Sequence, residues 1–224
     1  MGLGYFVIIG VFMLLGSLVS GQLKSKMRKY GKMPTSSGLS GAEVAATMLR
    51  DSGIQDVKIV QGKGMLTDHY NPKTKTISLS PAIFQGRNVA AAAVAAHECG
   101  HAVQHATEYP FLQMRSQLVP IVKLSSGLYF WLILAGLGMG FMQLAWVGVA
   151  LFGAATLFSL VTLPVEFDAS NRALAWLDKT GITRGQEYSG AKDALKWAAR
   201  TYVVAAFASI AQLLYWFMVV QGRN

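Results

Sequence analysis

The alanine-rich stretch NVAAAAVAAHECGHAVQHA, residues 88–106, contains the most specific motif of this chain, HExxH. Alanine has the highest helix propensity, so the stretch predicts a helix. Positions i and i+4 share one helix face, which allows His97 and His101 to offer two imidazoles to one Zn²⁺. Glu98 lies about 100° around the helix and can contact a water molecule at the metal without ligating it. This spacing is typical of a zinc hydrolase.

Outside this stretch, the composition indicates a membrane protein. Hydrophobic residues make up 53% of the chain and charged residues only 14%, whereas a soluble domain carries about 25% charged residues. The uncharged runs 3–19, 124–165 and 201–220 account for the difference. The middle run is long enough for two spans, and Gly136–Gly140 with Gln143 mark a reversal near its centre.

We therefore expect a mainly α, polytopic membrane protein with about four transmembrane helices, a zincin-like HExxH helix and a small β-hairpin. The first run lacks the basic start and the A-x-A site of a signal peptide, so we interpret it as an uncleaved anchor. The expected segments are an N-terminal anchor (1–20), a cytoplasmic segment (21–123), a two-span hairpin (124–165), a second cytoplasmic segment (166–200) and a C-terminal transmembrane helix (201–224).

Charged residues are sorted between the two sides of the membrane. The segments 21–123 and 166–200 hold 19 of the 20 Lys and Arg and all 11 Asp and Glu. A basic cluster, Lys24 to Lys32, directly follows the first span, so the positive-inside bias places the HExxH face in the cytoplasm, beneath the inner (plasma) membrane. The net charge of +9 then reflects topology and anionic lipid. No nucleic-acid motif is visible. The sequence is compatible with a homo-oligomer or with a membrane protein partner.

The first cytoplasmic segment contains local folding signals ahead of the motif. Ser40 and Glu43 form an S-x-x-E capping box for a helix that runs to about Asp51. The runs 57–60 and 76–79 predict short strands separated by a turn, and hence a hairpin. Its exposed edge could bind an extended peptide by strand addition, or the hairpin could simply cover the site. The two interpretations are equally supported by the sequence.

A catalytic zinc usually takes a third protein ligand. His105 continues the series of histidines, but on an unbroken helix it lies about 12 Å along the axis from His97, too far for one ion. Glu166 is the better candidate, because a carboxylate at the membrane end of an apolar run needs a partner, and two crossings return the chain to the same side. Asp168 could instead ligate the metal, or orient a ligating histidine.

HECGH, a predicted transmembrane hairpin and then VEFDASNRA resemble the bacterial membrane zinc metallopeptidases called neutral zinc metallopeptidases. The stretch TDHYNPKTKTISLSPAIF is also similar to that family. More distantly, the layout resembles the HtpX-type membrane proteases, whose third ligand is the Glu of an E-x-x-A-D pattern. Glu166 and Ala169 match this pattern, whereas Ser170 stands at its Asp position and Asp168 is the nearest substitute. The resemblance implies zinc-dependent peptide hydrolysis at the membrane.

The expected function is that of a zinc metalloendopeptidase acting on membrane or membrane-adjacent proteins. Glu98 would accept a proton from the attacking water and pass it to the leaving amine. An oxyanion stabiliser is also needed, and His69 is the preferred candidate over Tyr70 and Arg172.

Two other functions compete with this one. A non-hydrolytic membrane scaffold or regulator could keep HExxH as a structural zinc site, although such a site does not require Glu98. A metal transporter is disfavoured, because runs 124–165 and 201–220 contain no charged residue that could form an ion site at the bilayer midplane.

Overall fold

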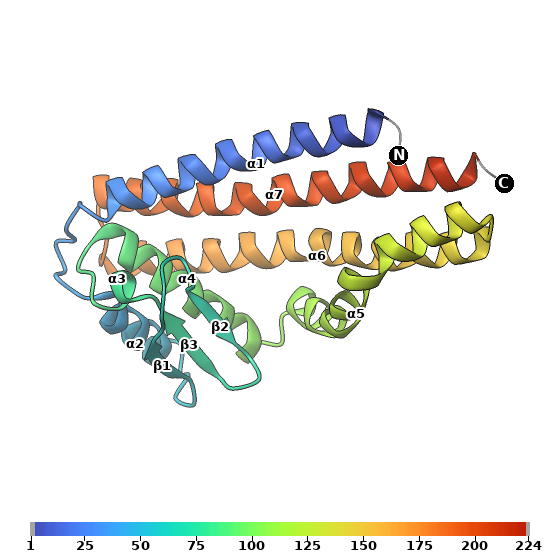
Figure 1. Cartoon of the computed structure of the whole chain (residues 1–224). Helices are drawn as coiled ribbons and strands as arrows, with labels where there is room; N and C mark the ends of the chain where they lie inside the picture. Colours follow the sequence, from blue (N-terminus) through green and yellow to red (C-terminus); the bar gives the residue numbers. More distant parts are fainter. Residues whose placement is uncertain (1–2, 223–224) are drawn as a thin grey trace. The chain divides into compact units, whose positions relative to one another are not determined.

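A computed structural model describes residues 3–222 of the chain, which are mainly helical. Seven helices and three short strands follow one another along the sequence (Figure 1). Their bounds are α1 Leu3–Tyr30, α2 Gly41–Asp51, β1 Lys58–Gln61, β2 His69–Asn71, β3 Thr76–Leu79, α3 Pro81–Phe84, α4 Val89–Ala106, α5 Pro110–Met139, α6 Met142–Thr180 and α7 Gln186–Gln221.

Four helices, α1, α5, α6 and α7, are long and apolar enough to cross a membrane, as the uncharged runs predict. Each extends beyond its apolar run into charged sequence at one end; α1, for example, includes the basic cluster up to Lys29 and ends only at Tyr30. Lysine and arginine are good helix formers, so their charge ends a span without ending the helix. The break between α5 and α6 falls at Gly140 and Phe141, and Gly140 adopts the left-handed φ of +72° that favours glycine.

The chain divides into two compact units. One consists of the described residues 3–18, 110–164 and 201–222, which are mostly the apolar parts of the long helices. The other consists of residues 19–109 and 165–200 and includes the whole HExxH stretch and Glu166. All of the predicted site residues therefore belong to the second unit.

The core of the second unit forms around α2 and α4. The predicted capping box is present, because Glu43 N donates to Ser40 Oγ and Ser40 N donates to the Glu43 carboxylate. It starts α2 with its apolar face, including Val44 and Met48, buried against the alanine face of α4. The small alanine side chains let neighbouring backbone approach α4 closely.

The sheet of this unit has the strand order β1-β3-β2. The two predicted strands, β1 and β3, pair in parallel, so the expected hairpin is not formed between them. The hairpin is formed instead by β3 and β2, which pair antiparallel through registers such as Tyr70 with Ile77. β2 is an edge strand, and it packs on α4.

α4 and α6 make an unusually close approach inside this unit, at Gly100 and Ala169. A Cβ atom placed on Gly100 would lie 2.5 Å from the carbonyl oxygen of Ala169 and 3.0 Å from its Cα. Only glycine fits at this position of the HExxH motif without a backbone shift. The approach brings the start of the polar part of α6 beside the two motif histidines.

Candidate metal centre

Helix α4 presents the two histidines from one face. Its first turn is capped by Asn88, whose side chain accepts a hydrogen bond from Ala91 N at 2.9 Å. The helix then runs unbroken to Ala106, and the rings of His97 and His101 lie with their centroids 4.8 Å apart. The i, i+4 geometry expected from the sequence is therefore realised.

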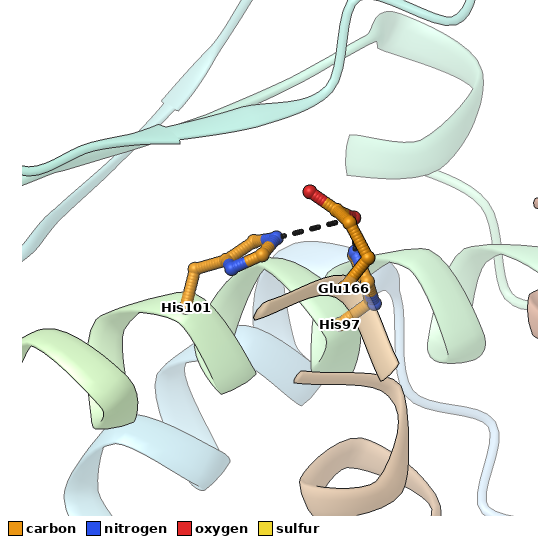
Figure 2. Close-up of side chains that lie close together, drawn as sticks. All are labelled: His97, His101 and Glu166. Atoms are coloured by element: carbon orange, nitrogen blue, oxygen red, sulfur yellow. Dashed lines mark ion pairs between the residues drawn. The ribbon is translucent and has the colours of Figure 1, made fainter. Parts of the chain in front are cut away.

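Glu166 reaches the same point from α6 (Figure 2). Its Oε2 lies 3.3 Å from His97 Nε2 and 3.7 Å from His101 Nε2. One ligand atom from each of the three residues can be chosen so that all lie within 4.8 Å of one another. Two imidazole nitrogens and one carboxylate oxygen are a donor set of catalytic zinc, so these residues fit the ion.

The three side chains lie in a largely buried environment, with Glu166 only 3% exposed and His101 only 8% exposed. Burial alone would lower the pKa of the His101 ring. The carboxylates of Glu166 and Glu98 outweigh it, so that the pKa of His101 is raised. Glu98 is itself buried, and its carboxylate contributes to the raised pKa of His101. Glu98 is not one of the three candidate metal ligands.

The second ring nitrogen of each histidine has its own partner. His97 Nδ1 lies 3.1 Å from Ser170 Oγ, and His101 Nδ1 lies 3.0 Å from Gln104 Oε1. Ser170 stands at the Asp position of the E-x-x-A-D pattern, so here a hydroxyl contacts the histidine. Such partners hold the ring of a metal-binding histidine in place.

Asp168 lies outside the three-residue group and reaches His101 through an intermediate. Gln104 Nε2 donates to Asp168 Oδ2 and to the Val165 carbonyl oxygen, both at 2.8 Å. Arg172 Nε donates to the same Asp168 oxygen at 2.6 Å. Asp168 is therefore linked to His101 through the side chain of Gln104.

Sequence reasoning gave no role to Gln104 and did not identify Ser170 as a partner of His97. The sequence held a signal for both residues. Gln104 is three residues after His101 and Ser170 is four residues after Glu166, and such spacings place two side chains on the same helix face. What the sequence alone could not provide was the contact between the faces of α4 and α6.

The other two histidines lie in different surroundings. His69 is exposed on β2, and its Nδ1 lies 2.8 Å from the Thr67 carbonyl oxygen. No ion pair or hydrogen bond recorded among residues 3–222 joins it to His97, His101 or Glu166. His105 Nδ1 lies 2.8 Å from the hydroxyl of Tyr70, and His105 is not part of the candidate metal-binding group.

Comparison with known proteins identifies the family of the chain. Residues 5–221 match the family described as "Putative neutral zinc metallopeptidase". The chain is also 41% identical, over 204 residues, to the "Putative membrane protease YugP" of Bacillus subtilis (strain 168), a match that covers 91% of each chain. No solved structure matches significantly. From the extent of the family match, the chain belongs to the neutral zinc metallopeptidase family.

Proposed function

We propose that this protein hydrolyses peptide bonds of membrane or membrane-adjacent proteins in a zinc-dependent reaction. One observation carries the proposal: His97, His101 and Glu166 direct three zinc-type donor atoms to one point, next to the buried carboxylate of Glu98. These three residues would hold the ion. A structural zinc site has no need of a fourth, non-ligating carboxylate at that position.

Glu98 is the general base of the proposed reaction. Bound zinc would supply Lewis acidity, which makes water more acidic and polarises the scissile carbonyl. Glu98 accepts the proton of the attacking water and delivers it to the leaving amine nitrogen. Its burial keeps bulk water from competing for that proton.

The substrate chain would lie along β2. This strand is at the edge of the sheet, packs on α4 and therefore offers unpaired backbone groups beside the metal-binding helix. His69, exposed on the same strand, is the proposed stabiliser of the tetrahedral oxyanion. Tyr70 and Arg172 already contact His105 and Asp168, respectively, which favours His69 for this role.

The proposed location is the inner (plasma) membrane, with the site facing the cytoplasm. The basic cluster at the end of α1 supports this orientation through the positive-inside bias. The proposed organisation keeps the anchor 1–20, the two-span hairpin 124–165 and the last span 201–224 in the bilayer. Segments 21–123 and 166–200, which contribute the site residues, lie on the cytoplasmic side.

Glu98→Gln tests the proposed reaction. The substitution preserves size and removes the base, so we expect zinc content and melting temperature to be retained while turnover falls at least about 10²-fold. The wild type and the variant would be compared on an unfolded protein and on membrane substrates found by proteomics. His97→Ala and His101→Ala should lose most of the zinc, which elemental analysis of the purified proteins would measure.

Two results would count against the proposal. Equal cleavage by the wild type and Glu98→Gln would exclude Glu98 as the base. A wild type that holds zinc but cleaves nothing, with the same cellular phenotype as Glu98→Gln, would favour a scaffold or regulator with a structural zinc site.

A further inference from the structure

A cavity of about 440 Å³ lies beside the C-terminal part of α1. Lys24 and Arg28 line it together with apolar or small side chains that include Met65, Leu66 and Ala82. None of the three candidate metal ligands contributes to it. Its volume is in the range of cavities that bind small molecules, and its lining combines two cations with apolar surface.

The position of the cavity along α1 places it at the membrane surface. Residues 3–23 carry no charge, and 21 helical residues extend about 31 Å, close to the thickness of the hydrocarbon core. Lys24 is the first charged residue after this run, so Lys24 and Arg28 lie at the level of the lipid headgroups. Their i, i+4 spacing puts both on one helix face.

The charges of these two residues are not neutralised by the protein. No salt bridge is recorded for Lys24 or Arg28 among the described residues, whereas the neighbouring Lys26 pairs with Asp193 at 2.8 Å. Both side chains are exposed beside the cavity. A phosphate diester is the anion available at this depth of a bilayer.

The loop before β2 supplies apolar surface at the same place. Met65 is 85% exposed and Leu66 is 51% exposed, although both are among the most hydrophobic side chains of the chain. In water this exposure is unfavourable. Contact with acyl chains at the membrane surface would remove the two side chains from water.

We propose that this cavity binds one anionic phospholipid, with its phosphate between Lys24 and Arg28 and part of an acyl chain against Met65, Leu66 and Ala82. Phosphatidylglycerol serves as the probe, because its headgroup carries a net negative charge. Phosphatidylcholine of the same chain length carries none. The site is separate from the proposed hydrolysis, and its test requires no substrate.

The test counts lipids that stay bound. Full-length protein would be reconstituted in equimolar vesicles of the two lipids, extracted with an uncharged detergent and analysed by native mass spectrometry. The wild type should retain about one phosphatidylglycerol per chain in preference to phosphatidylcholine. The double variant Lys24→Gln/Arg28→Gln should reduce this occupancy at least about tenfold, since each basic residue near an anionic surface contributes about fivefold.

Two further variants separate a built site from general attraction. Ala82→Phe places a large side chain in the cavity from an exposed position and should also reduce lipid retention. Lys29→Gln/Lys32→Gln removes the same charge from the same end of the chain but outside the cavity lining, and should retain the lipid. Circular dichroism and zinc content would show that each variant is folded.

Three outcomes would overturn the proposal. Equal losses in the two double variants would reduce the effect to diffuse attraction by the basic cluster. Unchanged retention in Ala82→Phe would place the lipid outside the cavity. Equal retention of the two lipids by the wild type would exclude recognition of an anionic headgroup.

Discussion

Gln104 determines which ring nitrogen of His101 is available to bind a metal ion. The two acceptors near Gln104 Nε2, the Val165 carbonyl oxygen and the Asp168 carboxylate, fix the amide so that Oε1 faces His101. His101 Nδ1 must then carry a proton, so the ring nitrogen left to bind a metal is Nε2, which lies 3.7 Å from Glu166 Oε2. A residue outside the HExxH motif thus selects the tautomer that zinc requires.

Gln104→Leu should therefore weaken zinc binding. Leucine preserves most of the side-chain volume and removes every hydrogen bond of the amide, so we expect a loss of affinity of about 10–100-fold. Competition with a chelating dye would measure it. Gln85→Leu is the matched control and should bind zinc like the wild type, because Gln85 is exposed and its side-chain amide donates to Gln61 Oε1 at 3.0 Å. An unchanged affinity in folded Gln104→Leu would disprove this role.

Ser170 allows a second test of the same principle on His97. Ser170→Ala removes the oxygen that lies 3.1 Å from His97 Nδ1 and should weaken zinc binding about tenfold. Ser170→Asp restores an acceptor and introduces the residue of the E-x-x-A-D pattern, so its affinity should equal or exceed that of the wild type. The same dye competition applies. Should alanine and aspartate have the same effect, the serine would serve packing alone.

At the level of single residues, the sequence predicts those roles that depend on local spacing. His97, His101 and Glu98 follow from one helix and its period. Glu166 could be proposed from the parity of membrane crossings, but its distance to the histidines depends on how α6 packs on α4. The partners Ser170 and Gln104 depend on the same packing, which local periodicity does not encode.

Among the elements, the crossing of α4 and α6 does most to assemble the site. A Cβ added to Gly100 of the motif would lie 2.5 Å from the backbone carbonyl oxygen of Ala169 on α6. Glu166, one turn before Ala169 on α6, is brought to the histidines by this contact. The spacing of the two helices therefore sets the distance between the ligands.

Gly100→Ala should push the helices apart. Overpacking of a well-packed contact is destabilising by about 1–3 kcal/mol, and separation of α6 from α4 should also reduce zinc content. Gly153→Ala is the matched control, because Gly153 lies within α6, the partner helix of this contact, and its added Cβ would meet no atom within 4 Å. Thermal unfolding and metal analysis would check both. Equal stability and zinc content in the two variants would show that the contact tolerates a methyl group.

The elements differ in how well their sequence predicts them. The capping box predicts the start of α2, and the glycines near Gly140 predict the reversal between α5 and α6. β2 escaped prediction because it has only three residues, His69–Asn71, with no alternation long enough to recognise. The parallel pairing of β1 with β3 could not be predicted from the two strands either. Its direction depends on β2, which lies between them along the chain.

At the scale of the molecule, two solvents shape the surface. The largest exposed apolar side chains of α1, such as Leu3, Phe6 and Met13, precede its first charge. In contrast, the polar side chains that form the candidate site belong to the unit of residues 19–109 and 165–200. Contact with lipid explains the exposed apolar side chains of α1, because exposed apolar surface on this scale is unfavourable in water.

The orientation of the chain in the membrane follows from the same sorting of charge and can be tested by cysteine labelling. Cys99 is fully buried, and burial raises the pKa of its thiol, so it should react little with a labelling reagent. Cys99→Ala then provides a chain without any native cysteine. In that background Ser37→Cys, at an exposed position after the basic cluster, should resist an impermeant maleimide in intact cells and react once the membrane is permeabilised. Gln143→Cys, beside the α5–α6 turn, should react in intact cells. The positive-inside bias requires this pattern, and the reverse pattern would place the metal centre outside the cell.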